Sequence, residues 1–185
     1  MTGRPRSFDQ DAALLLSMER FWQNGYERTT IGDLTATLGI TAPSLYAAFG
    51  DKDTLFASAA AHYVASVTAQ MDKTLSQPNV RDGLAELFRV TVESYTDEKT
   101  PPGCFLLSEP RLADERRTLT ARLAGHLRRG IDDGFLDAST DADALAEFTI
   151  AVIAGMSTRA RDGGSAAEVR AIADVALAAV DAHAI

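Results

Sequence analysis

The chain has 185 residues, of which 46% are hydrophobic, so it is long and apolar enough to bury a substantial core. Its net charge of −8 argues against a protein whose whole surface attracts nucleic acid. It contains no run of about 18 uncharged apolar residues, one cysteine and three scattered histidines, so a membrane span, an internal disulfide and a structural zinc site are not expected.

Helix-forming residues are spread along the chain, and runs of alternating β-branched residues are missing, so the sequence predicts an all-α protein. Glycines and prolines mark the breaks between helices. About nine helices are expected, at 9–25, 30–37, 41–48, 51–75, 80–98, 104–110, 112–134, 140–161 and 165–182.

Several helices begin with a recognisable N-cap. A hydroxyl residue followed three positions later by an acid can satisfy the first free N–H groups of a helix. This pattern occurs at Thr30, Thr140 and Ser165, and simpler N-caps are expected at Asp51 and Asn79.

The first three expected helices can share one small core. Leu14, Met18 and Phe21 recur at i, i+4 and i+7 and form one apolar face. The next two helices offer apolar partners for this face: Ile31, Leu34, Leu38, Leu45 and Phe49. Between them, Gly39 can adopt the left-handed conformation that ends a helix, and Thr41 can cap the next. This is the layout of a helix-turn-helix with a short glycine-containing turn.

The third helix suits entry into the major groove of DNA, because small side chains at its start allow close approach to base edges. Pro43 in its first turn removes no hydrogen bond, since that N–H has no helical partner. Tyr46 stands among mostly apolar neighbours.

Much of the first 55 residues resembles the N-terminal signature of TetR-family regulators. The resemblance rests on ordered elements of this sequence: Gly25-Tyr26, Thr30, Gly39-Ile40-Thr41, Leu45-Tyr46, Phe49 and Lys52-Asp53. The opening Gly3-Arg4-Pro5-Arg6 resembles the basic leader of many members. Two places depart from the common pattern: Thr35 stands where a small alanine is usual, and Ala47-Ala48 where a Tyr-His pair is frequent. The alanines remove possible polar contacts.

The resemblance implies a DNA-binding domain at 1–53 and a ligand-binding and dimerisation domain at 54–185. Thr30 and Thr41 would offer hydroxyls or helix N-termini to phosphates, Tyr46 would contact a phosphate or a base, and Lys52 would contact the DNA backbone. The residues nearest the bases would be Ala42, Pro43 and Ser44, and Arg4 and Arg6 would reach the minor groove or a phosphate. Readout would depend on Ser44, thymine methyl groups and DNA shape.

Each of these residues also has a plainer interpretation. Both threonines could be caps alone, Tyr46 an ordinary half-buried tyrosine, Lys52 a solvated charge and the leader a disordered segment. The joint occurrence of these residue types at these spacings favours the DNA-binding interpretation.

The last two helices are the expected dimer interface. The eighth is apolar on nearly every side and the ninth carries an apolar stripe, so the pair could form a four-helix bundle with a second copy. The candidate residues are Ile150, Ile153, Ala154, Val169, Ile172, Ala173, Ala176 and Val180. Alternatively, both helices could simply close a monomeric core.

A pocket for a small molecule is expected among the fifth to eighth helices. The candidate residues are Phe88, Thr91, Tyr95, Cys104, Phe105, His126 and Phe148. An aromatic stripe of this kind is also common in a plain core, and Cys104 could be a small buried hydrophobic residue.

The sequence thus predicts a one-component transcriptional repressor that binds a palindromic operator as a homodimer and is released by a small-molecule effector. It would be cytoplasmic, with no membrane partner and no cofactor. An enzyme is disfavoured because no glycine-rich phosphate loop, catalytic triad, metal-ligand spacing or paired carboxylates stand out. An adaptor that has lost DNA binding stays open, because residues 1–53 carry five basic and seven acidic side chains.

Overall fold

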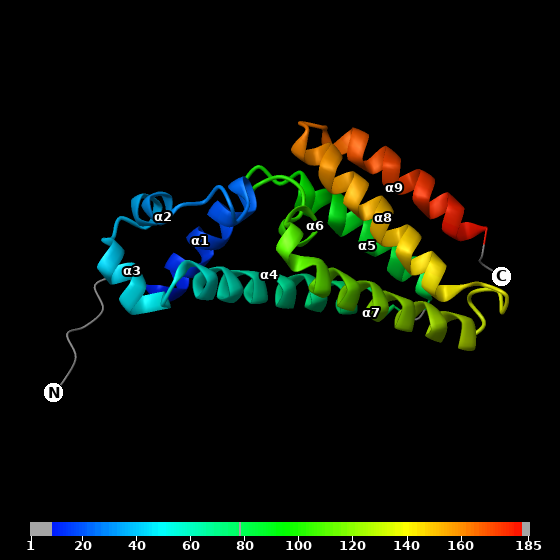
Figure 1. The fold of residues 1–185 in the computed structure, drawn as a ribbon. Coiled ribbons are helices and arrows are strands. Elements are labelled where there is room, and N and C mark those ends of the chain that lie inside the picture. Colours follow the sequence, from blue (N-terminus) through cyan, green and yellow to red (C-terminus); the bar gives the residue numbers. More distant parts are fainter. Residues whose placement is uncertain (1–8, 78, 183–185) are drawn as a thin grey trace. The chain divides into compact units, whose positions relative to one another are not determined.

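The computed structural model describes residues 9–77 and 79–182. Within these ranges the regular elements are helices and no β-strand occurs, which confirms the all-α prediction. Figure 1 shows their order along the chain. In this described part, no helix is both long enough and apolar enough to cross a bilayer.

The described residues up to Tyr63 form one compact unit. It contains the first three helices and the beginning of a fourth: α1 (Gln10–Asn24), α2 (Ile31–Leu38), α3 (Ala42–Phe49) and α4 (Lys52–Thr74). Phe21 of α1, Leu34 of α2 and Leu45 of α3 are completely buried. The phenyl rings of Phe21 and Phe56 meet edge to face, 5.2 Å apart. The first three helices therefore pack into one small core, as predicted. Of the expected α1 face, Leu14 and Met18 are only half-buried, and Ala13, Ser17 and Trp22 are buried with Phe21.

The ends of α2 and α3 follow the expected capping chemistry. Thr30 and Asp33 form a reciprocal capping box at the beginning of α2. Gly39 ends α2 with φ at 63°, in the left-handed region, and the Thr41 hydroxyl accepts the Ser44 N–H at the beginning of α3. These caps confirm the predicted helix-turn-helix layout.

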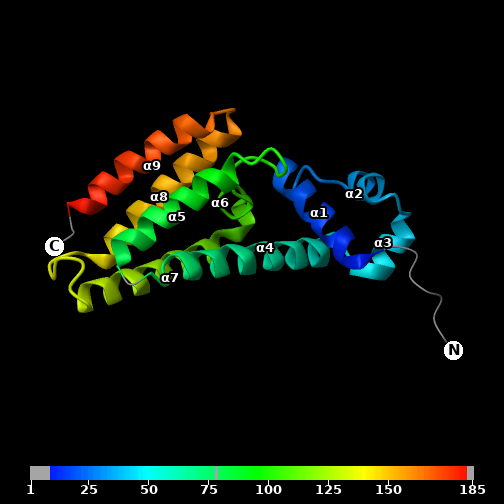
Figure 2. The same cartoon turned by 180° about the vertical axis from the view of Figure 1, so that it is seen from behind.

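From Val64 onward the chain forms a second compact unit. It contains the end of α4 and the remaining helices: α5 (Val80–Tyr95), α6 (Phe105–Ser108), the 3₁₀ helix η1 (Pro110–Leu112), α7 (Ala113–Asp132), α8 (Ala142–Arg161) and α9 (Ala166–Asp181). α8 packs between α7 and α9, and α5 packs against α9 and α8 (Figures 1 and 2). The two units join inside α4, whereas the expected boundary after residue 53 lies near the beginning of that helix.

Two of the helix ends that differ from the sequence prediction have a clear physical reason. The N-cap of α8 is Asp141, whose carboxylate accepts the N–H groups of Asp143 and Ala144. The predicted capping role of Thr140 was therefore wrong, because the adjacent carboxylate accepts two hydrogen bonds at once. α5 ends at Tyr95, three residues earlier than expected, and the Tyr95 carbonyl accepts the N–H of Gly103 at 3.0 Å.

Gly103 lies where α6 approaches α8 closely. Its φ is 77°, and a Cβ placed on it would lie 2.7 Å from both the carbonyl and the hydroxyl oxygen of Ser157. The same Ser157 hydroxyl accepts the N–H of Cys104 at 2.9 Å. Glycine is therefore required here both by the backbone conformation and by the packing.

We expect Gly103→Ala to destabilise the second unit more than Gly134→Ala does. Gly134 has nearly the same φ, 76°, but nothing lies within 4 Å of its added Cβ, so its substitution costs only the backbone strain, about 1–2 kcal/mol. The clash at Gly103 should add about 1–3 kcal/mol. Urea unfolding at one protein concentration measures the difference, and equal losses for the two variants would contradict the packing argument.

Candidate nucleic-acid interface

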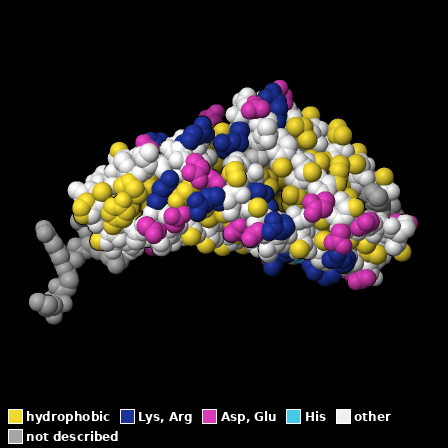
Figure 3. Space-filling model, viewed as in Figure 1, with side chains coloured by type: hydrophobic (Ala, Val, Ile, Leu, Met, Phe, Trp, Pro, Cys, Tyr) yellow, Lys and Arg dark blue, Asp and Glu magenta, His cyan; other side chains and the backbone are white. Residues whose placement is uncertain are grey.

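The orientation of α3 is set by one buried side chain. Leu45 is fully buried, and at 3.6 residues per turn Pro43 and Ala47 lie almost opposite it, facing solvent. Tyr46 lies on one flank with 49% of its surface exposed. Figure 3 shows hydrophobic side chains gathered over the α2–α3 end of the first unit. The exposed face of α3 is therefore small and apolar, with a single large polar-tipped side chain.

The hydroxyl groups at the helix starts have local partners. Thr41 Oγ1 lies 3.0 Å from Ser44 Oγ, and Ser44 is half-buried. Thr30 donates its hydroxyl to Asp33 at 2.7 Å and its N–H to the same oxygen at 2.8 Å. These hydrogen bonds hold the pKa of the Asp33 carboxyl below its ordinary value. Both threonines are exposed caps, which leaves them accessible to a phosphate.

Lys52 is held in place by an aromatic ring. Its ammonium lies 4.0 Å from the centre of the Tyr26 ring, a cation–π arrangement. The Tyr26 hydroxyl in turn donates to Asp53 Oδ1 at 2.7 Å. The structure thus positions a cation at the beginning of α4. No local pattern in the sequence predicts this arrangement, because its partners are separated by 26 residues.

The remaining predicted DNA contacts are Ala42, Arg4 and Arg6, and only the first lies within the described residues. Ala42 is half-buried at the first position of α3. Arg4 and Arg6 lie outside the described residues. Within the first unit, the structure brings together Thr41, Pro43, Ser44 and Tyr46 on α3 and its cap.

The residues predicted to bind an effector lie in three different regions of the second unit. Phe88, Thr91, Tyr95, Cys104 and Phe105 are all buried in the second unit, on α5 and at the start of α6. His126 lies on α7 beside Asp72. Phe148 is 41% exposed and lies on the outer side of α8, facing a different region from the buried residues.

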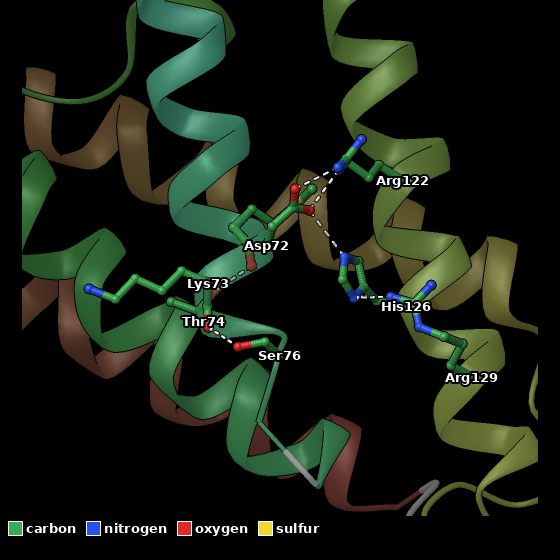
Figure 4. A network of polar contacts seen from close by, with 8 residues as sticks. Asp72, Lys73, Thr74, Ser76, Arg122, His126 and Arg129 are labelled. Carbon is green, nitrogen blue, oxygen red and sulfur yellow. Dashed lines mark hydrogen bonds and ion pairs between the residues drawn. The ribbon is translucent and has the colours of Figure 1, made fainter.

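Asp72, near the end of α4, is the centre of a polar network with α7 (Figure 4). Arg122 binds both of its carboxylate oxygens, at 2.6 and 2.5 Å, and this lowers the pKa of Asp72. His126 Nε2 lies 3.2 Å from the same carboxylate, while Arg129 contacts Nδ1. Because an arginine can only donate, Nδ1 accepts and Nε2 carries the proton that is donated to Asp72. The network therefore holds a neutral histidine.

The predicted dimer residues are mostly buried within the single subunit. Five of them are core residues: Ile153, Val169, Ala173, Ala176 and Val180. The other three, Ile150, Ala154 and Ile172, are half-buried. The exposed apolar surface of α8 and α9 contains a groove of about 430 Å³ lined by Phe148, Val152, Ala171, Ile172, Val175 and Ala176, so two of the predicted residues lie along it. Val175 on this face is 73% exposed.

Among the described residues, no group of three or more His, Cys, Asp or Glu side chains is arranged to hold a metal ion. The features that carry chemistry are a capped helix-turn-helix with an exposed second helix, a positioned lysine, and a helical unit with an apolar outer face. They define a helix-turn-helix regulator of the DNA-binding class.

Comparison with known proteins identifies the family. The model of bacterial regulatory proteins of the tetR family matches residues 14–59. The HTH-type transcriptional repressor ComR of Escherichia coli (strain K12) is 35% identical over 189 residues, covering 95% of this chain and 90% of that protein. The chain belongs to the TetR family, and it is a transcriptional regulator.

Two further proteins, a repressor and a TetR-family regulator of known structure, are also similar to this chain over nearly its whole length. The HTH-type transcriptional repressor BdcR of Escherichia coli (strain K12) is 28% identical over 177 residues, covering 94% of this chain and 90% of that protein. A solved structure of a cysteine mutant of CifR, a TetR-family regulator complexed with 26-bp double-strand operator DNA, is 38% identical with a TM-score of 0.85. It covers 96% of this chain and 100% of that chain.

We expect His126 to make the free energy of unfolding depend on pH. Burial has the largest effect and lowers the pKa of His126 below its ordinary 6.5. Arg129 and Arg122 act in the same direction, and Asp72 opposes them. Well above pH 6.5 the histidine is neutral in both the folded and the unfolded state and contributes no pH dependence. As the pH falls through 6.5 the unfolded state takes up the proton first, so stability decreases until the folded-state pKa is passed.

The variant His126→Gln should lack this loss of stability between pH 7.5 and 5.5, because glutamine does not titrate. Thermal unfolding at a series of pH values compares the two proteins, and His62→Gln, which changes an exposed histidine, is the matched control. Identical pH profiles for the wild type and His126→Gln would show that the network does not hold a neutral histidine.

Proposed function

We propose that this regulator is a repressor that binds a palindromic operator as a homodimer and leaves it when a small molecule binds the second unit. The observation that carries the proposal is the exposed face of α3. Leu45 fixes the helix on the core, Tyr46 projects beside it, and Lys52 is positioned at the beginning of the following helix. The operator complex of the CifR mutant, which is 38% identical to this chain, supports double-stranded DNA as the partner.

The outer face of α8 and α9 supports a homodimer. Figure 3 shows hydrophobic side chains spread over this part of the second unit. An apolar groove of about 430 Å³ with a valine that is 73% exposed is costly to leave in water. A second copy of the same face would cover it, since a two-fold interface joins identical surfaces. Two subunits would then present two α3 helices to successive major grooves, about 34–36 Å apart.

The helices α5, α6 and α4 support an effector site. Phe88, Thr91 and Tyr95 share one buried face of α5, and Cys104 and Phe105 follow at the start of α6. α4 begins in the first unit and ends in the second, where Asp72 fastens it to α7. A molecule that prefers one arrangement of these helices would change DNA affinity by its differential affinity for the two states.

We expect Tyr46→Ala and Lys52→Ala to weaken operator binding while leaving the fold intact, because neither side chain is a core residue. Removing the lysine should also lower the slope of log affinity against log salt by about 1 for each bound subunit. Operator duplexes selected from a random library, titrated at several salt concentrations, give both quantities.

Lys73→Ala, which removes an exposed lysine near the other end of the same helix, is the control for charge. It should leave the salt slope close to that of the wild type. If Lys52→Ala and Lys73→Ala have equal effects, Lys52 is a solvated charge and not a phosphate contact. If the protein binds no duplex at any salt concentration, the adaptor interpretation holds.

We expect Val175→Asp to produce monomers with operator affinity reduced by a hundredfold or more, because an unpaired carboxylate would be buried in the interface. The side chain is 73% exposed in the single subunit, so its own fold should survive. Ile153 and Val169 are unsuitable for this test, since both are buried and their substitution would damage the subunit core.

Light scattering coupled to size exclusion measures the mass of each variant. Ala121→Asp introduces the same charge on an exposed position of α7 and is the matched control. A Val175→Asp protein that stays dimeric, or a wild type that is monomeric at micromolar concentration, would contradict the proposed interface.

A further inference from the structure

We infer that the regulator reads its operator chiefly through the methyl groups of thymine, which Pro43 and Ala47 contact in the major groove. This inference rests on the proposed function and deepens it, because it states which chemical group of the DNA gives specificity. Three observations lead to it, together with the chemistry of the major groove: the rotation of α3, the composition of its exposed face, and the hydrogen bond between its nearby hydroxyls.

The rotation of α3 places two purely hydrocarbon side chains on its solvent-exposed face. Leu45 is fully buried, and successive residues turn by about 100° around a helix. Pro43 and Ala47, two positions before and after Leu45, therefore lie within about 20° of the direction opposite to it. Both are exposed. They stand four residues apart, one above the other along the same face.

The polar groups of α3 are few, and the nearest of them already shares a hydrogen bond. The helix Ala42–Phe49 contains no arginine, lysine, asparagine or glutamine, the residue types that form bidentate hydrogen bonds with guanine or adenine. The Ser44 hydroxyl lies 3.0 Å from the Thr41 hydroxyl, and Ser44 is half-buried. Pro43 has no N–H to donate. Tyr46 is the one exposed polar-tipped side chain of the helix, and it lies on the flank.

The major groove offers one apolar group to such a face. Guanine, adenine and cytosine present hydrogen-bond donors and acceptors there, whereas thymine adds a C5-methyl group. A proline ring and an alanine methyl placed against base donors and acceptors would remove water from these polar groups without replacing its hydrogen bonds. This loss of hydrogen bonds would weaken binding. Against a thymine methyl they bury apolar surface on both sides.

The spacing on the helix limits where the thymines lie. Residues four apart on a helix are separated by about 6 Å along its axis, and stacked bases are about 3.4 Å apart. If α3 runs along the groove, Pro43 and Ala47 reach bases about two steps apart. The predicted half-site therefore carries two thymines, on either strand, within about two base steps of each other.

The experiment replaces each thymine of the selected operator half-site with deoxyuridine, which removes the methyl group and keeps the Watson–Crick pair. The full-length protein should bind about fourfold more weakly for each contacted methyl removed, the change expected for one buried carbon group. Deoxyuridine outside the half-sites should leave the affinity unchanged.

Two variants separate contact from an effect on DNA shape. Ala47→Gly removes the alanine methyl, so it should bind the thymine and deoxyuridine operators almost equally at the position that Ala47 contacts. Ala61→Gly, an exposed alanine of α4 in the same unit, carries the same helix-propensity cost and should keep the fourfold preference.

The outcomes distinguish this inference from the function on which it rests. Specific binding that is unaffected by deoxyuridine at every half-site position would overturn methyl readout and leave the repressor proposal standing. An undiminished preference for thymine in both Ala47→Gly and Pro43→Ala would also overturn it, since the effect would then come from the DNA alone. Failure to select any duplex would overturn the repressor proposal itself.

Discussion

The burial of Leu45 is the interaction on which the interface depends. This side chain anchors α3 to the core that contains Phe21 and Leu34, and it therefore fixes which face of the helix is turned to solvent. A helix of eight residues has little stability of its own, so its rotation is decided by packing and by the Thr41 cap. The same contact that stabilises the first unit thus selects the residues that can approach DNA.

Sequence reasoning succeeded where the signal is local. The Thr30 capping box, the left-handed Gly39 and the Thr41 cap follow from residue types a few positions apart, and the structure contains all three. The assignment failed at Thr140, where two adjacent residues could both cap and the carboxylate of Asp141 does so. The contact of Lys52 with Tyr26 could not be predicted, because it depends on how the chain returns after α3.

The ninth helix shows a different limit. Its sequence contains an apolar stripe with further apolar residues beside it, and periodicity alone does not say which of these residues face the subunit core. The structure buries Val169, Ala173, Ala176 and Val180 against the same chain and leaves Val175 and part of Ile172 outside. The choice follows from packing against α5 and α8. Most of the interface residues predicted from this stripe are therefore also core residues of the subunit, while Ile172 and Ala176 lie along the outer groove.

Alanine-methyl NMR of the protein, labelled at the alanine ¹³Cβ and titrated with a selected operator duplex, tests the orientation of α3 most directly. This helix contains Ala42, Ala47 and Ala48, and of these Ala47 lies opposite the buried Leu45, while Ala48 lies toward the core side. The account predicts the largest methyl shift at Ala47 and a smaller one at Ala48. A larger shift at Ala48, or no shift at any of the three while the duplex binds, would contradict it.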